Sequence, residues 1–112
     1  MKKVFISQGM NGKTEKAIKS ERAYLKNVAE SALIDKVKVI DSYIEENAPK
    51  NTKQALWYLG ESLKLMADAD VVIFAKDWQE YRGCKIEHEA ALAYGITVIE
   101  SYSKEKGDVE NA

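Results

Sequence analysis

The sequence predicts an α/β fold built from one domain of 112 residues. Four short apolar runs, rich in valine and isoleucine, have the length and composition of strands. Longer segments between them space their apolar residues as helices do. Strands that alternate with helices favour right-handed crossovers. We therefore expect a small doubly wound parallel sheet, Rossmann-like or flavodoxin-like, with about four to five strands and helices on both faces.

The first half of the chain contains two of the expected strands, Lys3–Ile6 and Val37–Ile40. A glycine-containing turn, Ser7–Gly12, follows the first strand. Thr14 is the expected N-cap of a helix that runs to about Leu33. The apolar stripe expected on this helix consists of Ala17, Ala23, Tyr24, Val28 and Ala32.

The middle of the chain begins with a loop, Asp41–Thr52, which holds the only proline. Thr52 is the expected cap of a helix over Lys53–Ala67. The third strand, Val71–Ala75, is apolar throughout and is expected to be buried on both faces.

The last expected helix covers Cys84–Tyr94, and Gly95 marks its C-terminal end. Ile96–Ile99 forms the fourth strand. The core-facing stripe expected on this helix is Ile86, Ala90 and Ala93.

Composition excludes several classes of function. There are 17 basic and 18 acidic residues, so no basic field is available to hold polymeric nucleic acid. No apolar run reaches the roughly 20 residues of a membrane helix. A single cysteine excludes an internal disulfide and a cysteine-rich metal site. We expect a cytoplasmic protein that binds no metal or cofactor and does not associate with a membrane.

A strand order of 2-1-3-4 would bring two loops together at the carboxyl edge of the sheet, where α/β proteins bind ligands. These loops are Ser7–Gly12 and Asp77–Gly83. The two glycines of the first loop let a ligand approach the backbone closely. The alternative is a tight turn that binds nothing.

Glu87 is the strongest candidate for a catalytic residue. It lies about one turn into the last helix, where free N–H groups and the helix dipole favour a negative charge. An ionised carboxylate there could act as a nucleophile. The alternative is that Glu87 and Glu89 are ordinary first-turn acids on a solvated face.

Asp77 is the second catalytic candidate, because an acid at this point can bind sugar hydroxyls; its alternative is to cap the backbone. Trp78 and Tyr81 could stack on a base, seal the sheet edge or form a subunit contact. Arg82 could bind a phosphate or pair with a neighbouring acid. The full set of expected substrate-binding residues is Ser7, Gln8, Gly9, Met10, Trp78, Tyr81, Arg82 and Gly83. We expect His88 to be either a surface residue or a residue whose hydrogen bonds are satisfied within the protein, and we expect Cys84 to be a packing residue.

Two segments resemble a small phage and bacterial family of unknown function that is related to the nucleoside 2-deoxyribosyltransferases. Phe5–Gly12 is similar to its opening strand and Ser-x-Pro-Met-x-Gly turn, with Gly9 in place of the proline. Trp78–Gly95 is similar to its Trp-x-x-x-Arg-Gly-Cys-x-x-Glu-His-Glu-x-x-x-Ala-x-Gly run.

The resemblance implies that Glu87 corresponds to the nucleophilic glutamate of the transferases, and that Asp77 corresponds loosely to their sugar-binding acid. Glu89 stands where the transferases usually have glycine. The implied reaction is a two-step exchange at an N-glycosidic bond. The resemblance also implies a homo-oligomer, a dimer or larger, in which a neighbouring subunit completes the site.

Three functions remain open on the sequence alone. The first is an enzyme that cleaves or transfers the glycosyl group of a nucleoside or nucleotide. The second is a non-catalytic module that binds a nucleotide in the same crevice. The third is an oligomeric protein with a face for a protein partner, to which Trp57, Tyr58 and Tyr81 would belong.

Overall fold

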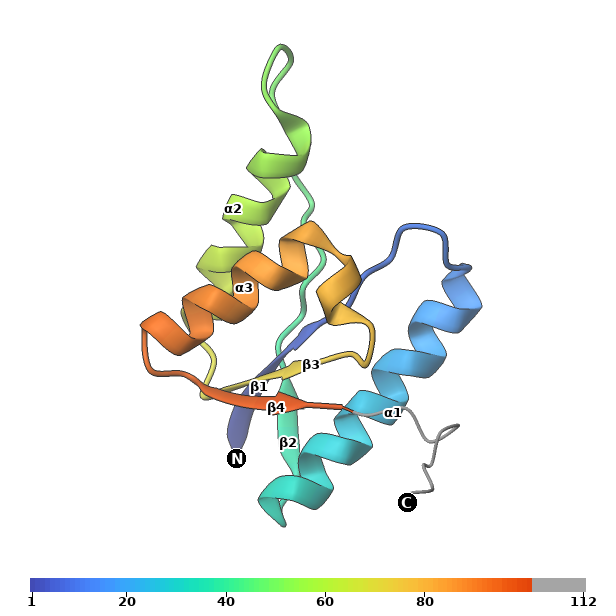
Figure 1. Ribbon diagram of the computed structural model, residues 1–112, viewed down its shortest axis with the longest axis vertical. Coiled ribbons are helices and arrows are strands. Elements are labelled where there is room, and N and C mark those ends of the chain that lie inside the picture. The colour runs from blue at the N-terminus through green and yellow to red at the C-terminus, as the bar shows by residue number, and fades with distance from the viewer. Residues whose placement is uncertain (102–112) are drawn as a thin grey trace.

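The computed structural model describes residues 1–101 as a single parallel sheet of four strands with helices around it (Figure 1). The strand order is β2-β1-β3-β4, and every neighbouring pair is parallel. The α/β class and the order 2-1-3-4 are therefore confirmed. The elements in chain order are β1 (Lys2–Ser7), α1 (Glu15–Leu33), β2 (Val37–Val39), α2 (Gln54–Met66), β3 (Val71–Phe74), the 3-10 helix η1 (Trp78–Glu80), α3 (Arg82–Ala93) and β4 (Thr97–Glu100).

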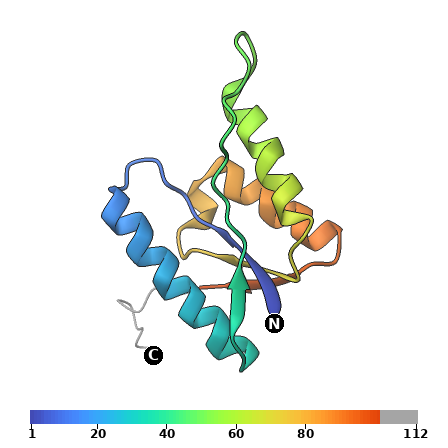
Figure 2. The ribbon, with the colours of Figure 1, turned by 180° about the vertical axis from the view of Figure 1, so that it is seen from behind.

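The sheet separates two apolar layers, because successive strand residues point to opposite faces. Alternate residues of β1 and β3, such as Val4 and Ile73, pack with Leu25 and Ala29 of α1. The residues between them pack with α2 and α3; these are Phe5, Val72 and Phe74. Figures 1 and 2 show α1 on one side of the sheet and α2 with α3 on the other. The expected helices on both faces are confirmed.

Helix α1 begins as expected but buries a different face. The Thr14 hydroxyl accepts a hydrogen bond from the N–H of Ala17 at 3.1 Å, so the predicted cap is confirmed. The fully buried residues are Leu25 and Ala29, with Val28 packed beside them. The predicted stripe was wrong outside Val28, since Ala17, Ala23, Tyr24 and Ala32 are exposed. Four of its five members are alanine or tyrosine, which helices also carry on solvated faces.

Helix α2 extends past the body of the sheet together with the segment that precedes it (Figures 1 and 2). Only Met66, at its C-terminal end, is fully buried, and Leu56 near its start is 64% exposed. Thr52 does not cap this helix, contrary to the prediction. Its hydroxyl donates instead to the carbonyl of Pro49 at 2.6 Å, and the cap position is Lys53.

Helix α3 is turned relative to the predicted orientation. Its buried residues are Cys84, Glu87 and Ala91, whereas Ile86 is 40% exposed and Ala93 is exposed. Gly95 ends the helix with a φ of 74°, a conformation that favours glycine. Because of this rotation, a carboxylate side chain enters the interior between α3 and the sheet.

The carboxyl ends of β1 and β3 lie side by side. Ser7 pairs with Phe74 in the ladder, and the N–H of Ala75 donates to the carbonyl of Ser7. The loops that follow therefore leave the sheet together, as predicted. Within residues 1–101, no helix combines the length and the apolar character required to cross a membrane.

Candidate functional site

Ser7 and Glu87 form a buried hydrogen bond between β1 and α3. The Ser7 hydroxyl donates to Oε1 of Glu87 at 2.6 Å, although the two residues are 80 positions apart. Ser7 is 1% exposed and Glu87 is 7% exposed. The parallel pairing of β1 with β3 and the rotation of α3 together produce this contact, so the last residue of a strand orients the carboxylate of a helix.

The environment of Glu87 works against its charge. Burial raises the pKa of its carboxyl group above the ordinary value of 4.5, and the hydrogen bond from Ser7 acts in the opposite direction. A buried carboxylate costs stability and needs donors around it. Such residues are enriched at sites of chemistry. The alternative of an ordinary solvated acid is wrong for Glu87, whereas Glu89 is exposed.

Cys84 lies beside this pair as a buried free thiol. Burial raises the pKa of the thiol above 9.0, hydrogen bonding with Ser7 lowers it, and the charges of Glu87 and Asp77 raise it further. A thiol with a raised pKa stays protonated and is a poor nucleophile. The expected packing role of Cys84 fits this environment.

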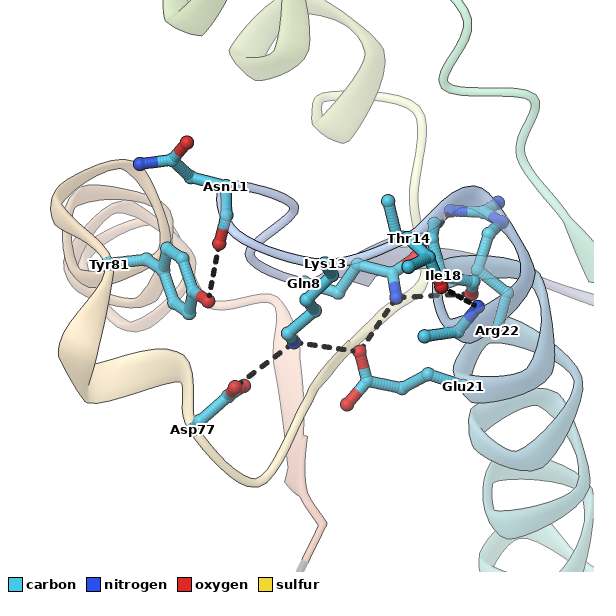
Figure 3. A network of polar contacts seen from close by, with 10 residues as sticks. Gln8, Asn11, Lys13, Thr14, Ile18, Glu21, Arg22, Asp77 and Tyr81 are labelled. Atoms are coloured by element: carbon cyan, nitrogen blue, oxygen red, sulfur yellow. Dashed lines mark hydrogen bonds and ion pairs between the residues drawn. The ribbon is translucent and has the colours of Figure 1, made fainter.

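Lys13 joins the loop after β1 to the loop after β3 (Figure 3). Its ammonium lies 3.0 Å from Oδ2 of Asp77 and 3.1 Å from Oε1 of Glu21 in α1. Burial acts to lower the pKa of Lys13, but the two carboxylates outweigh it and the pKa is raised. We call Ser7, Lys13, Asp77, Cys84 and Glu87 the edge cluster.

Asp77 has one satisfied and one unsatisfied oxygen. Oδ2 pairs with Lys13, whereas Oδ1 is buried and has no hydrogen-bond partner within the described residues. The alternative role of Asp77 as a cap is not realised, because its side chain makes no capping hydrogen bond to η1. A buried acceptor without a donor is costly and is uncommon in folded proteins. A ligand hydroxyl could supply the missing donor.

Tyr81 packs across the turn after β1. An added Cβ on Gly9 would lie only 2.2 Å from carbons of the Tyr81 ring, so the ring rests on the glycine backbone. The Tyr81 hydroxyl donates to the carbonyl of Asn11 at 3.1 Å, and the Lys13 ammonium lies 5.3 Å from the ring centre (Figure 3). Tyr81 and Lys13 therefore both connect the loop after β1 with the loop after β3.

Gln8 points toward α1, on the opposite face of the sheet from Ser7. Its amide nitrogen donates to Glu21 at 2.8 Å, and its amide oxygen accepts from Arg22 at 3.4 Å. Arg22 also donates to the hydroxyl of Ser42, which follows β2. Polar contacts thus continue along the edge from β3 through β1 to β2.

Trp78 and His88 form a separate aromatic stack. Their rings are 4.0 Å apart and nearly parallel, and both contact the ring of Phe74. His88 also lies 2.7 Å from a carboxylate oxygen of Glu100. Of the two expected roles of His88, the structure shows the satisfied one, because its ring stacks on Trp78 and its Nε2 contacts Glu100 of β4.

The remaining predicted binding residues lie elsewhere. Arg82 and Gly83 line a hollow of about 560 Å³ between α2 and α3, together with Lys53, Leu56 and Ile86 among others. No member of the edge cluster lines that hollow. Met10 is 50% exposed in the turn after β1. Of the ten predicted site residues, the structure brings together Ser7, Gln8, Gly9, Asp77, Tyr81 and Glu87.

Sequence reasoning missed Lys13, Glu21 and Arg22, all of which surround the predicted loops. The available signal was the position of Lys13 directly after the glycine turn at the sheet edge; Glu21 and Arg22 lie about two turns into α1. Among the residues that the structure describes, no three histidine, cysteine or acidic side chains are grouped as metal ligands. Comparisons with protein-family models, curated proteins and solved structures find no match for this chain.

Proposed function

We propose that the protein cleaves or transfers the N-glycosidic bond of a nucleoside or nucleotide, with Glu87 as the nucleophile. The observation that carries the proposal is the buried hydrogen bond of 2.6 Å from Ser7 to Glu87. It joins the two segments that resemble the deoxyribosyltransferase-related family, and it lies at the edge where α/β proteins bind ligands. A carboxylate nucleophile is the usual means of splitting glycosyl transfer into two easier steps.

The proposed reaction has two displacements at the anomeric carbon. An oxygen of Glu87 forms a bond to this carbon while the C–N bond breaks, and the base leaves with the electron pair and takes a proton from solvent. Water or a second base then attacks the same carbon and gives up a proton to solvent, while the C–O bond to Glu87 breaks and releases the carboxylate. Ser7 orients the attacking carboxylate, and its hydrogen bond favours the ionised form that the attack requires.

Asp77 is the proposed sugar ligand. Its buried Oδ1 lacks a donor in the described chain, and a hydroxyl of the sugar would provide one. The negative charge of Asp77 also favours a positively charged transition state at the sugar ring. Lys13 holds the other oxygen and fixes the orientation of the carboxylate.

Release of free base tests this function. The protein is incubated with a panel of 2-deoxynucleosides and their 5′-monophosphates, and the products are separated by chromatography. We expect base release by the wild type, none by Glu87→Gln, and wild-type activity for Glu89→Gln, an exposed acid on the same helix. The proposal fails if no substrate releases base, or if Glu87→Gln is as active as the wild type.

The second candidate is a non-catalytic nucleotide-binding module at the same edge. The burial of Glu87, together with the Tyr81 and Lys13 contacts that tie the loops, favours it. Thermal unfolding distinguishes the two functions: a module is stabilised by a nucleotide that is never consumed. A ligand at 100 times its Kd adds about 2.7 kcal/mol to the free energy of unfolding.

We also propose that copies of the chain associate in the cytoplasm. Exposed apolar side chains on α2, on α3 and at the C-cap of α3 support association; these are Leu56, Ile86, Leu92 and Tyr94. The single free thiol is suited to a reducing compartment. Light scattering during size-exclusion chromatography should give a mass of two chains or more, and a mass of one chain would contradict the association.

A further inference from the structure

Arg22 is a partly buried cation on α1. It projects from α1 toward the loops that follow β1 and β2, at the same edge of the sheet as the edge cluster. Its Nη1 contacts Oε1 of Gln8 and Oγ of Ser42, both at 3.4 Å. These distances are at the long limit for hydrogen bonds, and both acceptors are uncharged.

The charge of Arg22 is poorly compensated within residues 1–101. Burial lowers the pKa of the guanidinium, and the nearby charge of Asp41 raises it, but no ion pair forms between the two. An arginine carries five N–H donors in a planar fork and stays charged at neutral pH. In this part of the chain only Nη1 makes hydrogen bonds. The other donors are left for water or for a ligand.

Lys13, another cation at this edge, is in a different situation. Lys13 has two carboxylates within 3.1 Å, so its charge is already matched by Asp77 and Glu21. Gln8 donates to Glu21 and thereby keeps its amide oxygen turned toward Arg22 (Figure 3). Between Arg22 and Lys13, Arg22 is therefore the cation that is available to a ligand anion.

The neighbouring residues fit an anion. The Ser42 hydroxyl can rotate to donate to an oxyanion, since a hydroxyl is both donor and acceptor. Gln8 directly follows Ser7, so consecutive residues at the end of β1 contact Arg22 and Glu87, the nucleophile candidate. A molecule held at Asp77 and Glu87 would reach Arg22 by crossing the end of β1.

We infer that Arg22 and Ser42 form a subsite for the phosphate of a nucleoside monophosphate whose sugar lies at Asp77 and Glu87. The inference rests on the proposed function and specifies its substrate class as phosphorylated. A guanidinium fork binds phosphate oxygens in pairs, and hydrogen bonds to a charged group are about twice as strong as those between neutral groups. Gln8 acts as a positioning residue for Arg22.

Inorganic phosphate tests the subsite without reference to catalysis. Thermal unfolding of the full chain is followed in phosphate and in chloride at equal ionic strength. We expect phosphate to raise the Tm of the wild type and of Lys26→Gln, an exposed cation four residues further along α1. The increase should vanish in Arg22→Gln and shrink in Ser42→Ala. An equal increase in all four proteins overturns the subsite.

Nucleotides test the substrate class. By calorimetry, the wild type should bind a deoxynucleoside monophosphate at least about tenfold more tightly than the deoxynucleoside. Arg22→Gln should lose this preference and keep its affinity for the nucleoside. Arg22→Lys retains the charge without the fork and replaces Arg22→Gln if that variant does not fold; it should have an intermediate preference.

The two proposals fail in different ways. If the wild type releases base equally well from nucleosides and monophosphates, and binds them equally, the subsite is wrong and the proposed function stands. If phosphate stabilises the wild type through Arg22 but no base is ever released, the subsite stands and the catalytic function is wrong.

Discussion

The ring of Tyr81 packs directly on the backbone of Gly9, so that a Cβ at position 9 would lie 2.2 Å from ring carbons. Gly9→Ala must therefore displace the ring or the turn. We expect the substitution to lower the free energy of unfolding by about 1–3 kcal/mol, the usual cost of overpacking. Urea denaturation followed by circular dichroism measures it.

Two further variants make this prediction specific. Gly60→Ala is the control, since an added Cβ meets no atom within 4 Å there, and it should raise stability by about 0.5–1 kcal/mol in the middle of α2. In a Tyr81→Ala background, Gly9→Ala should cost much less than in the wild type. An unchanged cost in that background would mean that the ring is not the obstacle.

Ser7→Ala removes the donor from the buried Glu87 carboxylate. We expect a loss of about 1–3 kcal/mol in the free energy of unfolding at neutral pH, because a buried acceptor is left unsatisfied. The pKa of Glu87 should rise further, since the Ser7 hydrogen bond lowers it. Ser31→Ala, at an exposed site on α1, should change stability by less than about 0.5 kcal/mol. Equal effects of the two serine substitutions would contradict the burial of the pair.

Glu87 should make the stability of the protein depend on pH. Its pKa in the folded protein is raised above 4.5, so the unfolded chain releases this proton at lower pH than the folded chain does. The contribution of Glu87 to stability is therefore greatest below about pH 4.5 and falls as the pH rises through the folded pKa. Glu87→Gln keeps an acceptor for Ser7 and does not titrate.

The difference in unfolding free energy between wild type and Glu87→Gln measures this effect. As the pH increases from 4.5 toward neutrality, the unfolding free energy of the wild type should fall relative to that of Glu87→Gln. Glu89→Gln controls for the loss of a carboxyl group from α3. A difference that stays constant or shifts in favour of the wild type would show that Glu87 is not desolvated.

Lys13→Met should release the connection between the loops after β1 and β3. Asp77 and Glu21 both lose their cation in this variant. We expect the free energy of unfolding to fall by about 1–2 kcal/mol, which lies between the value of a surface ion pair and that of a hydrogen bond to a charged group. The cost should fall as salt is added. Lys19→Met breaks an exposed pair with Glu15 and should cost less than about 0.5 kcal/mol. If the two substitutions lower the free energy of unfolding by similar amounts, Lys13 stabilises the protein no more than an exposed lysine does.

The strands and their order were predictable because they depend on local composition and on the rules of crossover connections. The same rules placed the turn at Gly9 beside the loop at Asp77. The buried face of α3 was not predictable in this way. Alanines lie on several sides of this helix, and the apolar pattern left open whether Glu87 faces a site or solvent. Its partner Ser7 is 80 positions away, so no local pattern contains the contact.

Charged residues near the loops were missed for a related reason. Lys13 reaches Glu21 and Asp77 only because the turn after β1 bends back over the start of α1. Two separate loops must be positioned before these charges meet. Periodicity along a helix reports which side is apolar, but it does not report what a side chain at the end of a loop will contact.

The central position of β1 has a consequence for how the protein is made. β1 is synthesised well before its neighbour β3 and before α3, the helix with Glu87. Pairing across so long a separation is slow, since loop closure costs entropy before any contact forms. A nascent chain that ends before α3 holds Ser7 without its carboxylate partner. The buried Ser7–Glu87 pair at this edge can thus form only after α3 has been synthesised.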